Sequence, residues 1–194
     1  MIFDIEKVIK TAMAIQYDFS NELFFQKPIT ANYSQRKIFA MREPTSIYKI
    51  LTSLAMIYPD RNFAEVGCYN GMGTLAYLYG NPKAEILAID HKRRGDWMIE
   101  NRKYNVDYVT DSCFTHKFDK HFGVMLIDLT HNGRDEIVVM ENLKQCGLLK
   151  DCIIVFDDIH FMESMTKFWD ELDYPKKWDV TEHGHYTGTG IIVV

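Results

Sequence analysis

From residue 46 onward, short hydrophobic runs alternate with segments of helical spacing. Several runs consist of consecutive apolar residues, which is typical of parallel strands covered by helices on both faces. We expect these strands at 63–67, 85–90, 106–110, 122–128 and 152–157. The pattern therefore predicts an α/β fold with a largely parallel sheet.

Helices are expected between these runs. Residues 46–58 carry apolar side chains at helical spacing, and Pro59 ends that pattern. Further helices are expected at 74–80, 93–103, 134–147 and 162–172.

The two ends of the chain depart from this alternation. Residues 176–194 hold two strand-like stretches around a Gly, His and Thr-rich turn with no helix between them, so these strands must run antiparallel. His183 and His185 fall in that turn, where we expect them to be exposed to solvent. Residues 1–45 indicate a helix followed by an irregular aromatic-rich stretch, interpreted as a lid or substrate wall.

Composition narrows the class of protein. A chain of 194 residues with 47% hydrophobic content suits one domain with a sizeable core. The net charge of −5, without clustered bases, argues against nucleic acid and anionic membranes as partners. Four dispersed cysteines without a CxxC pair favour reduced thiols, and no apolar run approaches the roughly 20 residues that span a bilayer. We therefore expect a cytoplasmic globular protein.

The first strand leads into a glycine-rich turn, "EVGCYNGMGT", with glycines at 67, 71 and 73. Glycine there allows positive φ and lets backbone N–H groups approach a ligand at a helix N-terminus. Open parallel sheets bind ligands beyond the carboxyl ends of their strands, which is where this turn lies. The spacing is ExGxxxGxG, which differs from the GxGxxG dinucleotide fingerprint.

Acidic residues follow the next two strands. Asp90 ends the second strand, where a carboxylate can accept hydrogen bonds from ribose hydroxyls. Asp111 follows the third strand, and Glu65 lies inside the first strand, where burial of a lone charge would be costly. Each acid alone is compatible with a solvated turn, but their order on successive strands favours a cofactor site.

Three more acids follow the fourth and fifth strands: Asp128, and then Asp157 and Asp158 in "VFDDIH". If strands one, four and five are neighbours, the three carboxylates converge and repel one another unless they are protonated or neutralised by a cation. The alternative is a cap for the helix at 162–172. A capping box needs Glu or Gln three residues later, whereas His160 and Phe161 stand there.

With these motifs, the chain from about residue 46 to 194 resembles class I S-adenosylmethionine-dependent methyltransferases, in particular small-molecule O-methyltransferases. The resemblance implies a Rossmann-like three-layer sandwich with a seven-stranded sheet ending in an antiparallel hairpin, S-adenosylmethionine as cofactor and methyl transfer to a hydroxyl oxygen. It implies cofactor contacts from Glu65, Gly67, Cys68, Tyr69, Gly71, Gly73, Asp90, His91, Asp111, Ser112 and Asp128.

Metal-dependent members of that group similarly place one Asp after the fourth strand and an Asp-Asn or Asp-Asp pair after the fifth. The resemblance thus implies Mg²⁺, Mn²⁺ or Ca²⁺ at Asp128, Asp157 and Asp158, although members with a similar "DDIH" segment need not bind metal. The candidate catalytic residues are His131, His160 and Asp128, since a nearby His or Asp can take the acceptor's proton.

Two other functions fit a similar sheet. A NAD- or nucleotide-sugar-binding enzyme is opposed by the glycine spacing, and a non-catalytic methyltransferase-like binding protein is opposed by the intact set of acids and glycines. The sequence leaves the acceptor open, and a homodimer is compatible with it.

Overall fold

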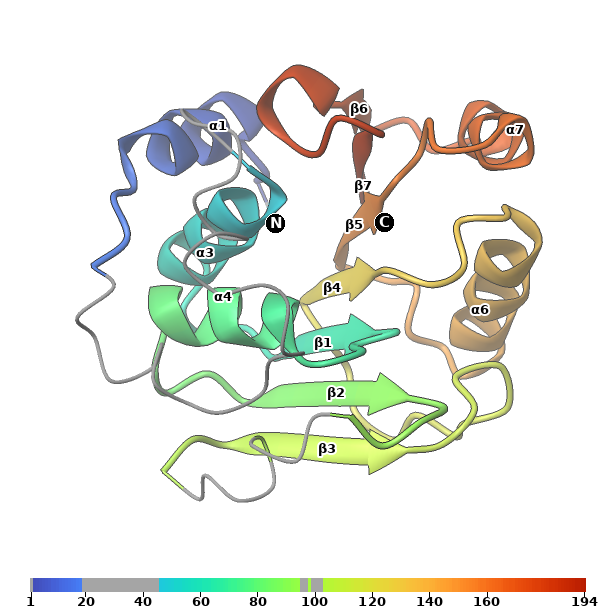
Figure 1. Ribbon diagram of the computed structural model, residues 1–194, viewed down its shortest axis with the longest axis horizontal. Coiled ribbons are helices and arrows are strands. Elements are labelled where there is room, and N and C mark those ends of the chain that lie inside the picture. The colour runs from blue at the N-terminus through green and yellow to red at the C-terminus, as the bar shows by residue number, and fades with distance from the viewer. Residues whose placement is uncertain (1, 19–45, 95–97, 99–102) are drawn as a thin grey trace.

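The computed structural model describes residues 2–18, 46–94, 98 and 103–194 (Figure 1). In these ranges, seven strands form one sheet in the order β3-β2-β1-β4-β5-β7-β6. The strands are β1 (Phe63–Val66), β2 (Ile86–Asp90), β3 (Val106–Thr110), β4 (Val124–Ile127), β5 (Ile153–Asp157), β6 (Lys177–Asp179) and β7 (Thr189–Val193). Strands β1 to β5 pair in parallel, whereas β7 pairs antiparallel with both β5 and β6. The predicted fold class is confirmed, and β1, β4 and β5 are neighbours.

Helices cover both faces of the sheet, with α1, α3 and α4 on one side and α6 and α7 on the other (Figure 1). They are α1 (Ile5–Ala14), α3 (Ile47–Ile57), α4 (Met72–Gly80), α6 (Arg134–Gln145) and α7 (Glu163–Glu171), and a 3₁₀ turn, η2 (Thr181–His183), lies between β6 and β7. Successive strand residues point to opposite faces, so Phe63 packs with α3 and α4 while Ala64 packs in the core of α6 and α7. Two covered faces explain the consecutive apolar residues of the central strands.

The N-terminal helix is part of the main core. The Asp4 carboxylate caps α1 by accepting the N–H of Lys7, and Val8 and Ala12 are buried against α3. The Ser53 hydroxyl donates to the carbonyl of Val8 at 2.8 Å. The interpretation of the following stretch as a lid concerns residues 19–45, which lie outside the described residues, as does most of the helix expected at 93–103.

Helix α7 begins without a side-chain cap, because its N-cap residue is Met162 and no side chain there accepts a hydrogen bond. Neither Asp157 nor Asp158 therefore caps this helix, in agreement with the absent capping-box spacing. The "DDIH" acids remain free for another role.

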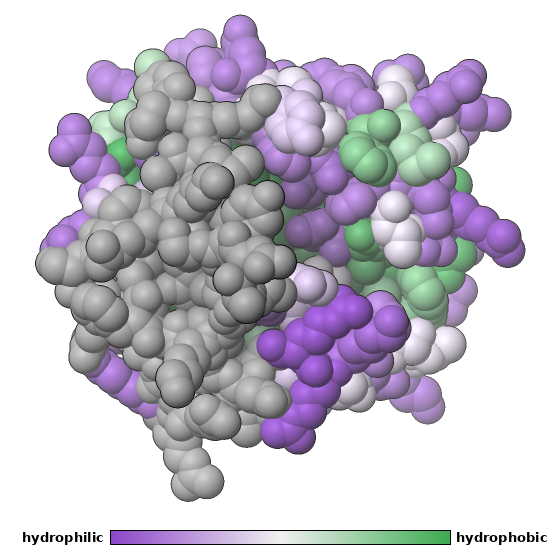
Figure 2. Space-filling model, in the orientation of Figure 1, coloured by the Kyte–Doolittle hydropathy of each residue, from purple (hydrophilic) through white to green (hydrophobic). Residues whose placement is uncertain are grey.

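Hydrophobic residues also reach the surface. Figure 2 shows green patches on the side of the molecule where α6 and α7 lie, and the exposed apolar residues of that region include Ile137, Val138, Phe161 and Met162. None of the described helices is long and apolar enough to cross a membrane. All four cysteines are free thiols, as predicted.

Candidate functional site

A cavity of about 630 Å³ lies where β1, β2 and β4 end. This volume falls within the range of roughly 300–1,000 Å³ that is usual for small-molecule sites. All of the predicted cofactor residues line the cavity except Gly71 and Asp111. Segments that are far apart in the sequence thus meet at the edge of the sheet where a ligand is expected.

Glu65 organises the glycine turn from inside β1. Its side chain is buried, and its carboxylate accepts the N–H of Gly73 at 2.8 Å and both the N–H and the hydroxyl of Thr74, at 2.6 and 2.5 Å. Burial raises the pKa of Glu65 to about 7, although these hydrogen bonds oppose the shift. The acid is therefore a buried structural anchor for the N-terminus of α4 rather than a solvated residue at a strand end.

Two of the glycines are required by close packing. Gly67 has φ +86°, and a Cβ there would overlap the backbone carbonyl of Asp128 on the neighbouring loop. A Cβ at Gly73 would lie 2.6 Å from Oε1 of Glu65. The missing side chains thus allow the turn to pack against the end of β4 and onto Glu65.

Asp90 ties the ends of β1 and β2 together. Its two oxygens accept the backbone N–H groups of Tyr69 and Lys92, each at 2.8 Å, and only 6% of the residue is exposed. Nδ1 of the neighbouring His91 lies 3.2 Å from the Asp90 carboxylate. Oδ2 of Asp90 accepts only the N–H of Tyr69 and keeps a second lone pair, so Asp90 can still accept a hydrogen bond from a ligand's hydroxyl group.

Asp111 pairs with a histidine of the loop that follows β3. Its carboxylate is exposed and pairs with Nδ1 of His116 at 2.9 Å, a hydrogen bond that lowers the pKa of Asp111. Ser112 and Phe114 line the cavity instead. The structure therefore brings Ser112 to the cavity and leaves Asp111 outside its lining.

A second group of side chains lies after β4 and β5. Nε2 of His131 lies between Asp128 and Asp158, 3.5 Å from Oδ1 of the first and 3.4 Å from Oδ2 of the second. His131 and Asp128 also line the cavity. One imidazole thus joins the cavity to the acidic pair.

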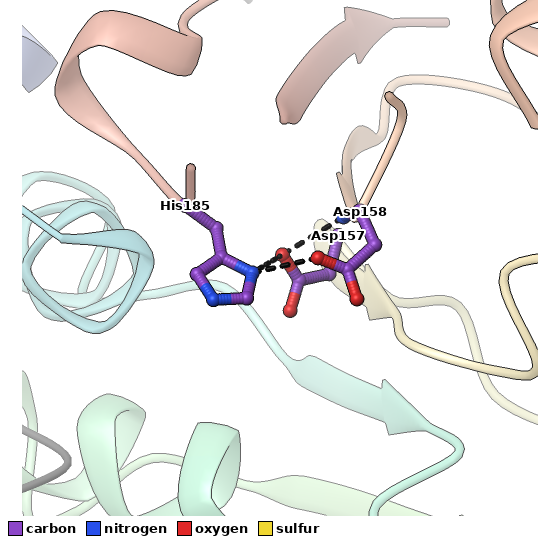
Figure 3. A group of neighbouring side chains, drawn as sticks. All are labelled: Asp157, Asp158 and His185. Atoms are coloured by element: carbon purple, nitrogen blue, oxygen red, sulfur yellow. Dashed lines mark hydrogen bonds and ion pairs between the residues drawn. The ribbon is translucent and has the colours of Figure 1, made fainter. Parts of the chain in front are cut away.

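His185 completes this group, and here the expectation of a solvent-exposed turn is wrong. Figure 3 shows the His185 imidazole turned toward both carboxylates. Its Nδ1 lies 2.7 Å from Oδ1 of Asp158 and 3.3 Å from Oδ1 of Asp157. The hydroxyl of Thr187 also donates to Asp158. The reason is topological: β7 pairs beside β5, with Thr189 opposite Asp157, so the turn before β7 folds over the end of β5.

The charges of this cluster shift its protonation equilibria in opposite directions. Although 35% of the Asp128 side chain is accessible, that surface faces the cavity, and burial followed by the charges of Asp157 and Glu65 raises the pKa of Asp128. Burial opposes ionisation of Asp158 too, but hydrogen bonds from His185 and Thr187 lower its pKa. Burial likewise opposes the charge on His185, while hydrogen bonds to Asp157 and Asp158 raise its pKa to about 10.

Backbone strain is concentrated at the same turns. Three non-glycine residues at these turns have a positive φ, in the left-handed region that residues other than glycine rarely adopt. They are Tyr69 at +45°, His131 at +57° and Asp158 at +58°. Each residue follows the end of β1, β4 or β5. Such strain persists where the surrounding structure fixes a functional side chain.

The donor set for a metal ion differs from the all-oxygen set of the hypothesis. Among the described residues, Asp157, Asp158 and His185 form the group whose ligand atoms all lie within 4.8 Å of one another, and Asp128 is outside it. Two carboxylates and an imidazole suit a transition metal such as Mn²⁺ better than Ca²⁺. These residues fit a divalent cation once His185 releases the Nδ1 proton that it shares with Asp157 and Asp158, and Asp128 lies outside the group.

His160 lies apart from the cavity. Its Nε2 bonds Oδ2 of Asp179 on β6 at 2.7 Å, and its backbone N–H donates to the carbonyl of Thr187. Of the two candidate histidine bases, the structure brings only His131 into contact with the acids at the cavity.

The comparisons with known proteins rest on the fold. The sequence matches no protein-family model and no curated protein. A methyltransferase of Podospora anserina, PaMTH1, solved with S-adenosylhomocysteine bound, superposes with a TM-score of 0.67 at 13% identity, covering 99% of this chain and 97% of that one.

Two N-methyltransferases also resemble the chain. Coclaurine N-methyltransferase, bound to N-methylheliamine and S-adenosylhomocysteine, has a TM-score of 0.53 at 14% identity, covering 94% of this chain and 69% of that one. NodS of Bradyrhizobium japonicum, in complex with S-adenosylhomocysteine, has a TM-score of 0.51 at 12% identity, covering 82% and 94%. At such identities the likeness establishes the fold: the chain has the Rossmann-like architecture of these methyltransferases.

Proposed function

We propose that this protein transfers the methyl group of S-adenosylmethionine to a small-molecule acceptor, at a hydroxyl oxygen. The observation that carries the proposal is the continuity of one cavity from the Glu65-anchored glycine turn and Asp90 to Asp128 and His131. The S-adenosylhomocysteine bound to the three similar structures gives further support.

The cofactor would be held by groups that the fold already fixes. The turn after β1 offers backbone close to the cavity, and Asp90 offers carboxylate oxygens to hydroxyl groups. Met72, Cys113 and Phe114 give part of the lining an apolar surface suited to a flat heterocycle. When bound, S-adenosylmethionine supplies an electrophilic methyl group on a sulfonium.

The other residues would manage the acceptor's proton. Methylation of a hydroxyl breaks the carbon–sulfur bond, whose electron pair stays on sulfur, and releases one proton from oxygen. His131 lines the cavity, and its Nε2 lies near Asp128 and Asp158, so a proton taken there is stabilised by two carboxylates. His131 is therefore the proposed base.

Binding of S-adenosylhomocysteine provides the primary test. Isothermal titration of the purified full chain should give one site per chain, while NAD and nucleotide sugars should give none. The absence of S-adenosylhomocysteine binding would overturn the proposal, and tight NAD binding would favour the dinucleotide alternative. Binding without turnover on any acceptor would favour a non-catalytic binding protein.

The acceptor atom requires a separate screen, because two of the similar structures are N-methyltransferases. We expect S-adenosylhomocysteine release with small hydroxylated compounds and much slower release with matched amines. The opposite ranking would retain methyl transfer and reject the oxygen acceptor.

Metal assistance is proposed on the Asp157, Asp158 and His185 group. A bound cation would lower the pKa of an acceptor hydroxyl. We expect EDTA to abolish turnover, Mn²⁺ or Mg²⁺ to restore it, and Asp157→Ala to lose metal affinity without unfolding. Full activity after EDTA dialysis would reject the metal and leave the methyl-transfer proposal intact.

A further inference from the structure

Two neighbouring residues behind the cavity each bury an unpaired polar atom. Among the side chains that the structure describes, these atoms are Nδ1 of His131 and Oε2 of Glu136, together with the hydroxyl of Tyr77 elsewhere in the core. Buried polar groups almost always have partners, so each exception calls for a physical reason. Nδ1 of His131 can donate a hydrogen bond, and Oε2 of Glu136 can accept one.

The two residues are already connected. Glu136 lies in the first turn of α6 and is only 1% exposed, and its Oε1 accepts the backbone N–H of His131 at 3.0 Å. This hydrogen bond holds His131 at its left-handed φ of +57°. The second oxygen of the same carboxylate is the unpaired one, so Glu136 has an acceptor left for the imidazole whose backbone it fixes.

The other side of the imidazole faces the proposed chemistry. Nε2 of His131 lies 3.4 Å from Asp158 and 3.5 Å from Asp128, and the ring packs edge-on to Phe161. The ring therefore has a buried nitrogen toward the interior and a reactive nitrogen toward the acids. A histidine base works best when a carboxylate on the far nitrogen selects the tautomer and the ring orientation.

We infer that Glu136 is a positioning residue for His131: its carboxylate fixes the backbone of the histidine, and its unpaired Oε2 is linked to the Nδ1 hydrogen through one bridging water molecule, so that Nε2 faces the acceptor. This inference rests on the proposed methyl transfer. The proton released by the acceptor passes to Nε2, while Glu136 orients the ring. Glu136 itself touches neither substrate nor cofactor.

Glu136→Gln tests this role with little change of shape. Glutamine keeps one oxygen for the backbone N–H of His131 but replaces the other by an NH₂ group, which cannot accept a hydrogen bond from the water that bridges to Nδ1. We expect kcat to fall by at least about ten-fold, which is less than the roughly 10²–10⁴-fold attributed to a general base itself, because Glu136 acts through His131. The KM for S-adenosylmethionine and the affinity for S-adenosylhomocysteine should remain within two-fold of wild type, on the order of experimental scatter.

Glu141→Gln is the matched control, because Glu141 lies on the same helix with an exposed side chain. It should leave kcat unchanged. The His131→Ala background supplies the decisive comparison, since residues acting as one unit are not additive. We expect Glu136→Gln to cause no further loss of kcat there. Independent, additive losses would show a merely structural role and overturn the inference.

A spectroscopic measurement keeps the test valid even if the Glu136 variants fold poorly. In the ¹⁵N spectrum of the wild-type imidazoles, His131 should carry a proton on Nδ1. A bare Nδ1 would overturn the inference whatever the variants do. Failure of wild-type protein to bind S-adenosylhomocysteine would instead reject the proposed function, so the two failures are distinguishable.

Discussion

The two halves of the cavity edge are built in different ways. After β1 and β2, the buried carboxylates of Glu65 and Asp90 each accept backbone N–H groups of a nearby turn. After β4 and β5, Asp128 and Asp158 contact the side chains of His131 and His185. Backbone donors are fixed by the fold, whereas imidazoles can change their protonation. The half after β1 and β2, which we call the backbone-built half, is thus suited to holding a constant cofactor. The half after β4 and β5, the side-chain-built half, is suited to handling protons.

The backbone-built half should fail most severely when its geometry is changed. Gly67→Ala places a Cβ against the carbonyl of Asp128 at a positive φ. We expect a loss on the order of 3 kcal/mol in the free energy of unfolding, from strain and overpacking, and loss of S-adenosylhomocysteine binding. Urea denaturation and calorimetry would measure both.

Gly147→Ala is the control for that variant. Gly147 has a similar φ of +73°, but a Cβ added there would have no atom within 4 Å. Only the backbone strain should therefore lower the free energy of unfolding, by about 1 kcal/mol. Equal losses in the two variants would show that close packing at Gly67 is unimportant.

The buried carboxylate of this half should give a pH signature. The pKa of Glu65 is raised to about 7. As pH rises from about 4.3, the unfolded chain loses this proton while the folded chain keeps it until the pH approaches the folded pKa, so stability falls across this window. At about 1.4 kcal/mol per pKa unit the fall reaches on the order of 4 kcal/mol.

Glu65→Gln stays neutral, so this component of the pH dependence should disappear. Denaturant curves of wild type and variant between pH 4.5 and 7.5 would measure the difference. The exposed Glu141→Gln should keep the wild-type slope. Parallel curves for Glu65→Gln and wild type would contradict a raised pKa at Glu65.

The side-chain-built half should lose rate while it keeps its affinity for the cofactor. His185→Asn removes the imidazole whose Nδ1 contacts both Asp157 and Asp158. The two carboxylates then repel each other more strongly. We expect kcat to fall by about ten-fold or more while S-adenosylhomocysteine affinity is retained. His183→Asn is the matched control, because His183 in the same turn pairs with the exposed Glu182. Equal activity in both variants would exclude a role for His185.

The smallest effect should come from Asp111. Its carboxylate is exposed and paired with His116, outside the cavity lining. Since such surface pairs contribute roughly 0–1 kcal/mol, Asp111→Asn should weaken S-adenosylhomocysteine binding less than about three-fold. Asp90→Asn should weaken it much more, as calorimetry would show. Comparable losses of binding in the Asp111→Asn and Asp90→Asn variants would support the direct cofactor contact that the sequence predicts for Asp111.

The backbone-built half is also the half that the sequence predicts well. Glu65 and the glycines lie within one contiguous stretch, 65–74, and Asp90 ends the next strand, so local spacing carries most of the information. Asp111 lies outside the cavity lining, and its carboxylate pairs with His116, five residues later. That pairing depends on how the loop folds, which strand-end position alone does not specify.

The other half depends on tertiary pairing. His185 reaches Asp158 because β7 lies beside β5. The antiparallel hairpin is predictable from the sequence. The local sequence pattern does not predict that β5 is the strand beside it. Glu136 was missed because it looks like an ordinary acid in a helix's first turn. Burial, which only the fold provides, distinguishes it.

The position of β7 also has a consequence for biosynthesis. Among the strands of the described residues, β7 comes last in sequence, yet it lies inside the sheet between β5 and β6. During synthesis β5 therefore presents an unpaired edge until the final strand emerges, and unpaired apolar edges invite wrong pairing with other chains. A nascent chain stalled just before β7 should bind chaperones, and the finished chain should release them as the sheet closes.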